Sequence, residues 1–334
     1  MKILWLSMDF RDTEFLKQKQ FKHFHQSLLD WLQKKAEVVC YSHPLSFCGS
    51  FNREGDVQKI VKKEKPDAIF IITAQGKKWN WKNLDKINDV LKIVRYTDFY
   101  GHLDYQIKFV NENKIDVMLV SEVITPYYKS RAKNTRVIPF PNYADTDYFK
   151  PLGLKRIYDV SCIGNFNRRI HPVRYLGRSC DYGKGIRTFF SSGHKLSGRT
   201  EYVRLLNQSK MTIFDGGHLK IPLKGQGDSK ANRAKGRLVI SGAWKWSESL
   251  ACKTLCLAER PTCVETLTYR PYFNYIPVTR NMSCNELVRL VKYYKENVKA
   301  RTKIVENGYK TFLKYHTTEK RVDSILKIIS EGKV

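Results

Sequence analysis

The first 140 residues alternate short apolar segments with amphipathic ones, and this alternation constrains the fold more than any other feature. Lys2–Ser7 and Ala68–Thr73 are apolar almost throughout, as is typical of strands buried on both faces. Phe21–Lys34 instead repeats Phe, Leu and Trp residues at helical spacing. Continuous apolar strands separated by helices predict a parallel, doubly wound α/β sheet.

The same reading extends along both halves of the chain. In the first half we expect strands at Lys2–Ser7, Glu37–Tyr41, Ala68–Thr73, Lys92–Tyr96, Val117–Ser121 and Arg136–Phe140, and helices at Phe21–Lys34, Val57–Lys63, Trp79–Val90, Tyr105–Asn113 and Thr125–Ala132. In the second half we expect strands at Tyr158–Gly164, Met211–Phe214, Leu238–Ser241 and Leu255–Ala258, and helices at Val173–Leu176, Glu201–Leu206, Ser247–Ala251, Cys284–Ala300, Thr302–Tyr315 and Thr318–Ile329.

A proline-bracketed segment, Pro139–Pro151, separates the two halves and predicts a stiff linker. We therefore expect an N-terminal Rossmann-like domain over residues 1–150 and a second Rossmann-like domain over 151–316. Residues 317–334 form a C-terminal helix that can pack back on the first domain.

The charge of the chain implies an anionic partner. Lys and Arg total 60 against 32 acidic residues, a formal net charge of +28. Nucleic acid, an anionic membrane surface, a glycan or a phosphorylated small molecule would each satisfy it. The eight cysteines form no CxxC pair, so we expect reduced core thiols and no structural metal. No apolar run is long enough for a transmembrane segment, and we expect a cytoplasmic protein, peripheral to a membrane or bound to nucleic acid if it meets either.

Ligands of a doubly wound sheet bind beyond the carboxyl ends of its strands. In the first domain Ser7, Asp9 and Gly76 lie at such ends and are candidates for contact with a ligand. Asp98 and His102 follow the strand Lys92–Tyr96 and lie at another of these ends. The first strand has no GxGxxG sequence after it, which disfavours a dinucleotide-dependent dehydrogenase. The DxD sequence at Asp145–Asp147 is better explained by an Asx turn than by a metal.

Gly242–Pro261 is the segment of the second domain with the most evident chemistry. Ser247 is placed to cap a helix, and Glu248 then falls in the first turn, where a carboxylate meets the positive end of the helix dipole. A carboxylate there can accept hydrogen bonds from a ribose diol, and the free N–H groups suit a phosphate. An ordinary capped helix is the alternative. The basic segment Gly216–Arg237 either binds a phosphorylated or polyanionic ligand or is a solvated insertion.

Several segments of the second half, taken in order, resemble one family. They are the linker PFPNYADTDYFKP at 139–151, YDVSCIGN at 158–165 with Arg168 and Arg169 after it, YVRLLNQSKMTIF at 202–214, SESLACKTLCLAE at 247–259, and YHTTEKRVDSIL at 315–326. Together they resemble the GT-B glycosyltransferases, most closely the spore-maturation (CgeB-like) branch of the glycosyltransferase group-1 superfamily. The resemblance covers residues 92–330.

This resemblance implies a GT-B fold, in which two Rossmann-like domains face a central cleft, and transfer of a sugar from a nucleotide-sugar donor. It implies a UDP-sugar as the donor, retention of configuration and no metal. The residues it assigns to the donor are Gly164, Asn165, Arg168, Arg169, Ser209, Lys210, Lys245, Ser247 and Glu248. Lys245 or one of the two arginines would offset charge on the departing diphosphate. The first domain would supply the acceptor contacts, with Ser7, Asp9 and Gly76 as candidates. It would also supply any catalytic base, with Asp98 and His102 as the candidate catalytic residues.

One position departs from the family pattern. Lys253 stands where the family has glycine, and its side chain is a further candidate for contact with phosphate. The acceptor stays open between an anionic or surface glycan and hydroxymethylated nucleic acid. The alternative function is a non-catalytic GT-B-like module that binds DNA or another polyanion.

Overall fold

The computed structural model describes residues 1–7, 24–42, 52–73, 81–96, 103–121, 124–192, 198–216, 218–222, 235, 237–240, 242, 244–262 and 267–332. The chain divides into two compact units. Unit 1 comprises residues 1–140, 220–237 and 321–334, and unit 2 comprises residues 141–219 and 238–320.

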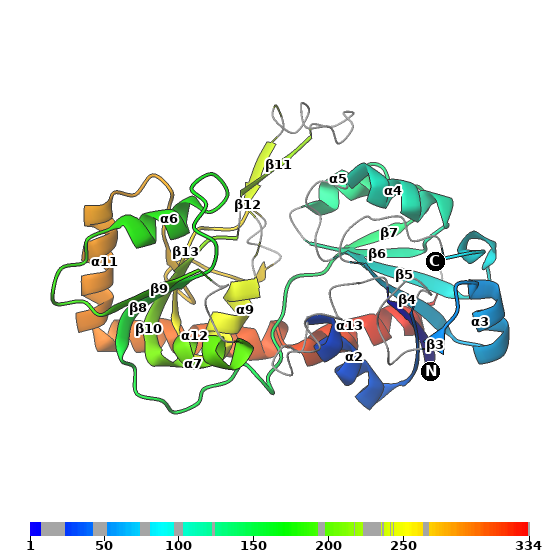
Figure 1. Ribbon diagram of the computed structural model, residues 1–334, viewed down its shortest axis with the longest axis horizontal. Helices are drawn as coiled ribbons and strands as arrows, with labels where there is room; N and C mark the ends of the chain where they lie inside the picture. Colours follow the sequence, from blue (N-terminus) through cyan, green and yellow to red (C-terminus); the bar gives the residue numbers. More distant parts are fainter. Residues whose placement is uncertain are drawn as a thin grey trace. The chain divides into compact units, whose positions relative to one another are not determined.

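Unit 1 is built on a seven-stranded sheet of order β3-β2-β1-β4-β5-β6-β7, in which every described strand pair is parallel (Figure 1). Its strands are β1 Lys2–Ser7, β2 Glu37–Ser42, β3 Asn52–Arg53, β4 Ala68–Thr73, β5 Leu91–Tyr96, β6 Val117–Val120 and β7 Arg136–Pro139. Its helices are α2 Phe24–Lys35, α3 Val57–Glu64, the short 3₁₀ helix η1 Leu84–Lys86, α4 Leu103–Glu112 and α5 Thr125–Lys129. The doubly wound sheet expected for the first domain is confirmed.

The last helix, α13 Thr318–Glu331, belongs to unit 1 from Arg321 onward. Asp323 pairs with Lys35 at 2.7 Å, and Glu331 pairs with Arg136 at 3.0 Å. These ion pairs are partly exposed and each contributes little free energy. They join the C-terminal residues to α2 and β7.

Unit 2 is built on a five-stranded parallel sheet of order β14-β13-β10-β8-β9 (Figure 1). Its strands are β8 Tyr158–Ile163, β9 Thr188–Ser191, β10 Ser209–Phe214, β13 Leu255–Ala258 and β14 Ile276–Pro277. Its helices are α6 Pro172–Ser179, α7 Arg199–Gln208, α9 Trp244–Ala251, α11 Cys284–Glu296 and α12 Val298–Tyr315. A separate two-stranded ribbon pairs β11 His218–Ile221 with β12 Arg237–Ile240.

Two apolar clusters cover the two faces of the sheet in unit 2. One face packs Val160, Ile213 and Leu257 against residues of α6 and α11. The other packs Phe214 and Cys256 against residues of α7, α9 and α12. Neighbouring residues of β10 enter opposite clusters, as the two-residue repeat of a strand requires. The sheet is thus buried on both faces, so ligands can reach it only at its edges and at its strand ends.

Several expected elements need correction. Within the described part of Trp79–Val90 there is only η1, because Asn83 adopts a left-handed backbone with φ of 60° and interrupts any helix there. In the expected strand Leu238–Ser241, the described residues 238–240 belong to a strand that pairs with β11 and not with the main sheet. Strands β3, β9, β11 and β14 were not expected.

The described cysteines carry free thiols, and Cys162, Cys180, Cys252 and Cys256 are buried, as expected. The Asp145 carboxylate accepts a hydrogen bond from the Asp147 N–H at 3.0 Å, which is the expected Asx turn.

Candidate functional site

The strand order of unit 2 reverses between β8 and β10. From β8 the chain moves to β9 on one side, and then to β10 on the other side of β8. In doubly wound sheets, ligands bind outside the carboxyl ends of the strands at such a reversal. Here those ends lead into Gly164 and Asn165 after β8 and Asp215 after β10.

Gly164 lets two cations approach the turn after β8. Its φ is +128°, a backbone conformation that L residues rarely adopt. A Cβ atom there would lie 2.8 Å from Nη1 of Arg174 and 3.3 Å from Cε of Lys245. Glycine is therefore required by both the backbone and the space, and the turn brings its own backbone next to a guanidinium and an ammonium.

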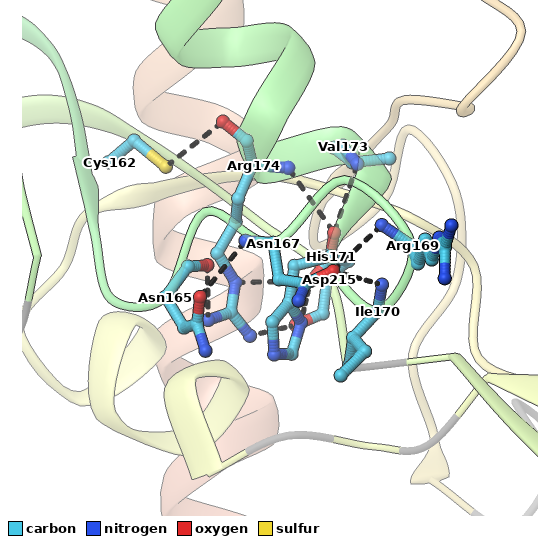
Figure 2. Close-up of polar contacts among 9 residues, drawn as sticks. All are labelled: Cys162, Asn165, Asn167, Arg169, Ile170, His171, Val173, Arg174 and Asp215. Carbon is cyan, nitrogen blue, oxygen red and sulfur yellow. Dashed lines mark hydrogen bonds and ion pairs between the residues drawn. The ribbon is translucent and has the colours of Figure 1, made fainter.

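Asp215 organises the segment between Gly164 and α6 (Figure 2). One of its carboxylate oxygens lies 2.7 Å from Nδ1 of His171 and 3.0 Å from Nε of Arg174. The other accepts hydrogen bonds from the N–H groups of Val173, at 3.0 Å, and Arg174, at 3.2 Å, and so caps α6 from a distant strand. Burial alone would raise the pKa of Asp215, but the His171 hydrogen bond and the Arg174 charge hold it below its usual value.

Helix α9 supplies a carboxylate and a cation, and Tyr202 of α7 connects them. The Tyr202 hydroxyl donates to Oε2 of Glu248 at 2.9 Å, and Nζ of Lys245 lies 3.5 Å from the same hydroxyl. The Lys245 ammonium also lies 4.8 Å from the centroid of the Tyr202 ring. Glu248 is buried, and burial with the Glu248 charge raises the pKa of Tyr202 well above its usual value.

Lys245 has an ammonium that pH can titrate near neutrality. Burial, with a smaller contribution from the Arg174 charge, lowers the pKa of Lys245 to about 8 against the opposing charge of Glu248. Within the described ranges no carboxylate oxygen lies within 4 Å of its Nζ atom. An anionic ligand beside the Gly164 turn would meet this charge.

Gly164, Lys245 and Glu248, predicted from the sequence as donor residues, lie together at this site. Asn165 and Arg169 belong to the turn that follows, where the Asn165 carboxamide accepts from the Asn167 N–H and the Arg169 N–H donates to Asn167, each at 2.9 Å. The guanidinium of Arg168 lies 5.7 Å from the Tyr175 ring centroid. These three side chains make no contact with Lys245 or Glu248 that would assign them a role.

The cap expected at Ser247 is wrong. Helix α9 begins at Trp244, so Ser247 is inside the helix and Glu248 lies beyond the first turn. The Ser247 hydroxyl donates to the Asn142 carbonyl at 3.1 Å, while the Asn142 amide donates to the Gly242 carbonyl. Glu248 is therefore placed by its helix face and by Tyr202, not by the helix dipole.

Ser209 and Lys210 lie at the opposite end of the sheet from the site. They begin β10, and Ser209 pairs with Tyr158 at the start of β8. The Ser209 hydroxyl donates to the Leu205 carbonyl at 2.7 Å, and Nζ of Lys210 pairs with Asp159 at 2.6 Å. The structure does not bring these two residues to Gly164 or Glu248.

Lys253 also lies away from the site, and its conformation explains why the family has glycine there. It lies two residues after the end of α9 and has a φ of 52°, the left-handed conformation that closes a helix and favours glycine. Its ammonium pairs with the Glu306 carboxylate on α12 at 2.8 Å and 3.0 Å. The side chain that was a candidate for phosphate contact is thus engaged by another helix.

In unit 1 the structure describes one of the five predicted residues. Ser7 is the last residue of β1 and is buried. Asp9, Gly76, Asp98 and His102 lie outside the described residues.

Sequence reasoning missed Asp215, His171, Tyr202 and the buried Arg174 as members of this site. Asp215 had a usable signal, because it directly follows the predicted strand Met211–Phe214. The others had none, since their contacts are made with residues remote in the sequence.

Several solved structures share the fold of this chain, and one of them is described as a glycosyltransferase. HepE from Anabaena, solved with UDP, superposes with a TM-score of 0.62 at 12% identity, covering 99% of this chain and 100% of that one. A glycosyltransferase from Rickettsia africae gives a TM-score of 0.61 at 11% identity, over 99% and 98% of the two chains. Sucrose-phosphate synthase from Thermosynechococcus elongatus gives 0.57 at 11% identity, over 99% of each. The protein thus has the GT-B fold, with two parallel α/β sheets.

A model of the family described as "Glycosyl transferase-like" matches residues 154–327, just over half of the 334-residue chain. The chain belongs to this family of group-1 glycosyltransferases. A search of curated proteins gave no match.

None of the helices among the described residues has the length and apolar character to cross a bilayer. No cluster of three or more His, Cys, Asp or Glu side chains suited to a metal ion occurs among them.

Proposed function

We propose that the protein transfers a sugar from a UDP-sugar to an acceptor, and that unit 2 holds the donor at the carboxyl ends of β8 and β10. The observation that carries this proposal is the meeting of a glycine turn, the Lys245 ammonium and the buried Glu248 carboxylate at the reversal of strand order. HepE has also been solved with UDP-glucose, which supports a uridine nucleotide as the donor.

Glu248 is the proposed ribose contact. Its Oε2 atom accepts from Tyr202, and no other hydrogen bond to its carboxylate occurs in the described part of the chain. A carboxylate oxygen free of protein donors in a buried setting suits a hydroxyl group, because a hydrogen bond to a charged acceptor is stronger than one between neutral groups.

Lys245 and Gly164 are proposed to hold the diphosphate. The departing UDP gains negative charge as the glycosidic bond breaks, and a fixed ammonium in a site of low dielectric stabilises that charge. The turn at Gly164 allows a phosphate to approach the backbone as closely as Arg174 and Lys245 do now. These groups supply positive charge from the chain itself, which supports transfer without a metal, and the family supports retention of configuration.

The acceptor is proposed to be polyanionic. A formal charge of +28 favours a partner of opposite sign, either a surface glycan or hydroxymethylated DNA. Binding that depends on salt and on the modified base would favour DNA. The ordered segments from the linker to the terminal helix also support the CgeB-like branch as the nearest group.

The donor proposal predicts a selective loss in Glu248→Ala. Because hydrogen bonds from ribose to a buried carboxylate would be lost, we expect UDP to bind about ten- to a hundredfold more weakly by calorimetry, with sugar transfer or donor hydrolysis reduced at subsaturating donor. The nucleotide panel should include UDP, GDP and ADP and their glucose conjugates.

Glu306→Ala is the matched control. It removes another carboxylate of unit 2, but one paired with Lys253 at a partly exposed position, so UDP affinity should be unchanged. Equal UDP affinity in Glu248→Ala and the unmodified protein would contradict the ribose assignment. If the protein bound polyanions but no nucleotide, the non-catalytic alternative would be favoured instead.

A further inference from the structure

One ring nitrogen of His171 contacts a carboxylate, and the other contacts no described residue. Its Nδ1 atom lies 2.7 Å from the Asp215 carboxylate, which is fully buried, and the His171 side chain is 15% exposed. No further interaction of its ring occurs with the part of the chain that the structure describes. Figure 2 shows the ring beside Asp215 and near the guanidinium of Arg174.

Asp215 determines which ring nitrogen carries the proton. Its carboxylate is ionised, since its pKa is held below the usual value, and an ionised carboxylate can only accept hydrogen bonds. Nδ1 of His171 must therefore donate. In a neutral imidazole the other nitrogen, Nε2, then presents a lone pair.

A lone pair at Nε2 that no described residue engages selects a hydrogen-bond donor as its ligand. The phosphate oxygens of a donor nucleotide are acceptors and would repel it, whereas sugar hydroxyls can donate. The ribose hydroxyls are already assigned to Glu248. The hydroxyls left on a UDP-sugar are those of the sugar being transferred.

We propose that Nε2 of His171 accepts a hydrogen bond from a hydroxyl of the transferred sugar, and that Asp215 is the positioning residue that fixes the ring tautomer. This inference rests on the proposed donor site and extends it to the recognition of the sugar. It assigns to one residue the difference in affinity between UDP and a UDP-sugar.

A purely structural role is the competing explanation. Asp215 caps α6 through Val173 and Arg174, and His171 precedes this helix, so the His171–Asp215 bond could serve only to hold the helix start. The two roles use different ring nitrogens, which allows them to be separated.

The variants His171→Asn and His171→Gln distinguish the structural role from the role in sugar recognition. An asparagine amide takes the place of Nδ1 and can still reach Asp215, while a glutamine amide takes the place of Nε2 and can still reach the ligand. The affinities are measured by calorimetry at pH 7.5, with UDP and with the UDP-sugar that the unmodified protein binds most tightly. We expect His171→Asn to bind the UDP-sugar about three- to tenfold more weakly, and His171→Gln to have an affinity closer to that of the unmodified protein. UDP itself should bind all three proteins equally. Ser179→Ala, on the same helix, is the control and should change neither affinity.

The outcomes are distinct. Unchanged UDP-sugar affinity in His171→Asn together with weaker affinity in His171→Gln would overturn the inference in favour of a structural role. Equal losses of affinity for UDP and for the UDP-sugar would also overturn it, and so would no loss for either ligand. Failure of the unmodified protein to bind any nucleotide would overturn the donor site itself, and with it this inference. Thermal unfolding of each variant shows whether the fold is retained.

Discussion

At the residue scale, the ammonium of Lys245 makes donor binding sensitive to pH. Its pKa is lowered to about 8, so the charge is present below pH 8 and is lost as the pH rises through this value. Since a diphosphate binds the charged form, binding above pH 8 must take up a proton. We expect UDP-glucose to bind about tenfold more weakly at pH 9 than at pH 7.

Lys245→Met is the control for this pH dependence. It removes the ammonium and retains most of the apolar length of the side chain, so its weaker affinity should vary with pH only as the ligand itself titrates. Calorimetry in two buffers of different ionisation enthalpy measures the proton uptake directly. The same pH dependence in both proteins would show that Lys245 does not contact the diphosphate.

Single residues differ in how far the sequence could place them. Glu248 and Lys245 are predictable, because they share a short segment and one helix face brings both to the site. Asp215 lies 44 residues from His171 and 41 from Arg174, so no local pattern reveals that it pairs with them. Lys210 was assigned to the donor site by the family resemblance alone. The register of β10 with β8 sets it beside Asp159, at the end of the sheet opposite to Gly164.

At the scale of one element, the turn between β8 and α6 depends on Gly164. Gly164→Ala would add a Cβ atom 2.8 Å from the buried Arg174 guanidinium and strain the backbone. We expect the free energy of unfolding in urea to fall by about 2 kcal/mol or more, and UDP affinity to fall with it.

Gly183→Ala is a matched control for the backbone cost alone. Gly183 also has a positive φ, of +69°, but a Cβ atom there would meet nothing within 4 Å. Its cost should be about 1 kcal/mol, with UDP affinity unchanged. Equal losses of stability in the two variants would mean that Arg174 and Lys245 do not crowd the Gly164 turn.

Helix ends were less predictable than strands. The strands Lys2–Ser7, Ala68–Thr73 and Leu255–Ala258 have the bounds expected from their apolar runs. Helix α9 begins at Trp244 and not after Ser247, because Ser247 finds its hydrogen-bond acceptor in Asn142, a residue of the linker. A capping residue cannot be recognised from sequence when a distant carbonyl competes for its hydroxyl.

At the scale of the whole molecule, alternation of strands and helices was enough to predict two parallel sheets. It did not predict β9 or the β11–β12 ribbon, because edge strands and ribbons lack the continuous apolar runs of central strands. It did predict that the ligands of such sheets bind beyond the carboxyl ends of the strands, which is where the proposed donor site of unit 2 lies.

The central claim is that a uridine nucleotide binds at the carboxyl ends of β8 and β10 in unit 2. Amide hydrogen exchange with and without UDP, followed peptide by peptide, tests it most directly. We predict slower exchange in residues 164–174 and 244–251, and unchanged exchange at Ser209–Lys210 and around the Lys253–Glu306 ion pair. UDP binding with protection confined to other segments, or no binding of UDP at all, would contradict the account.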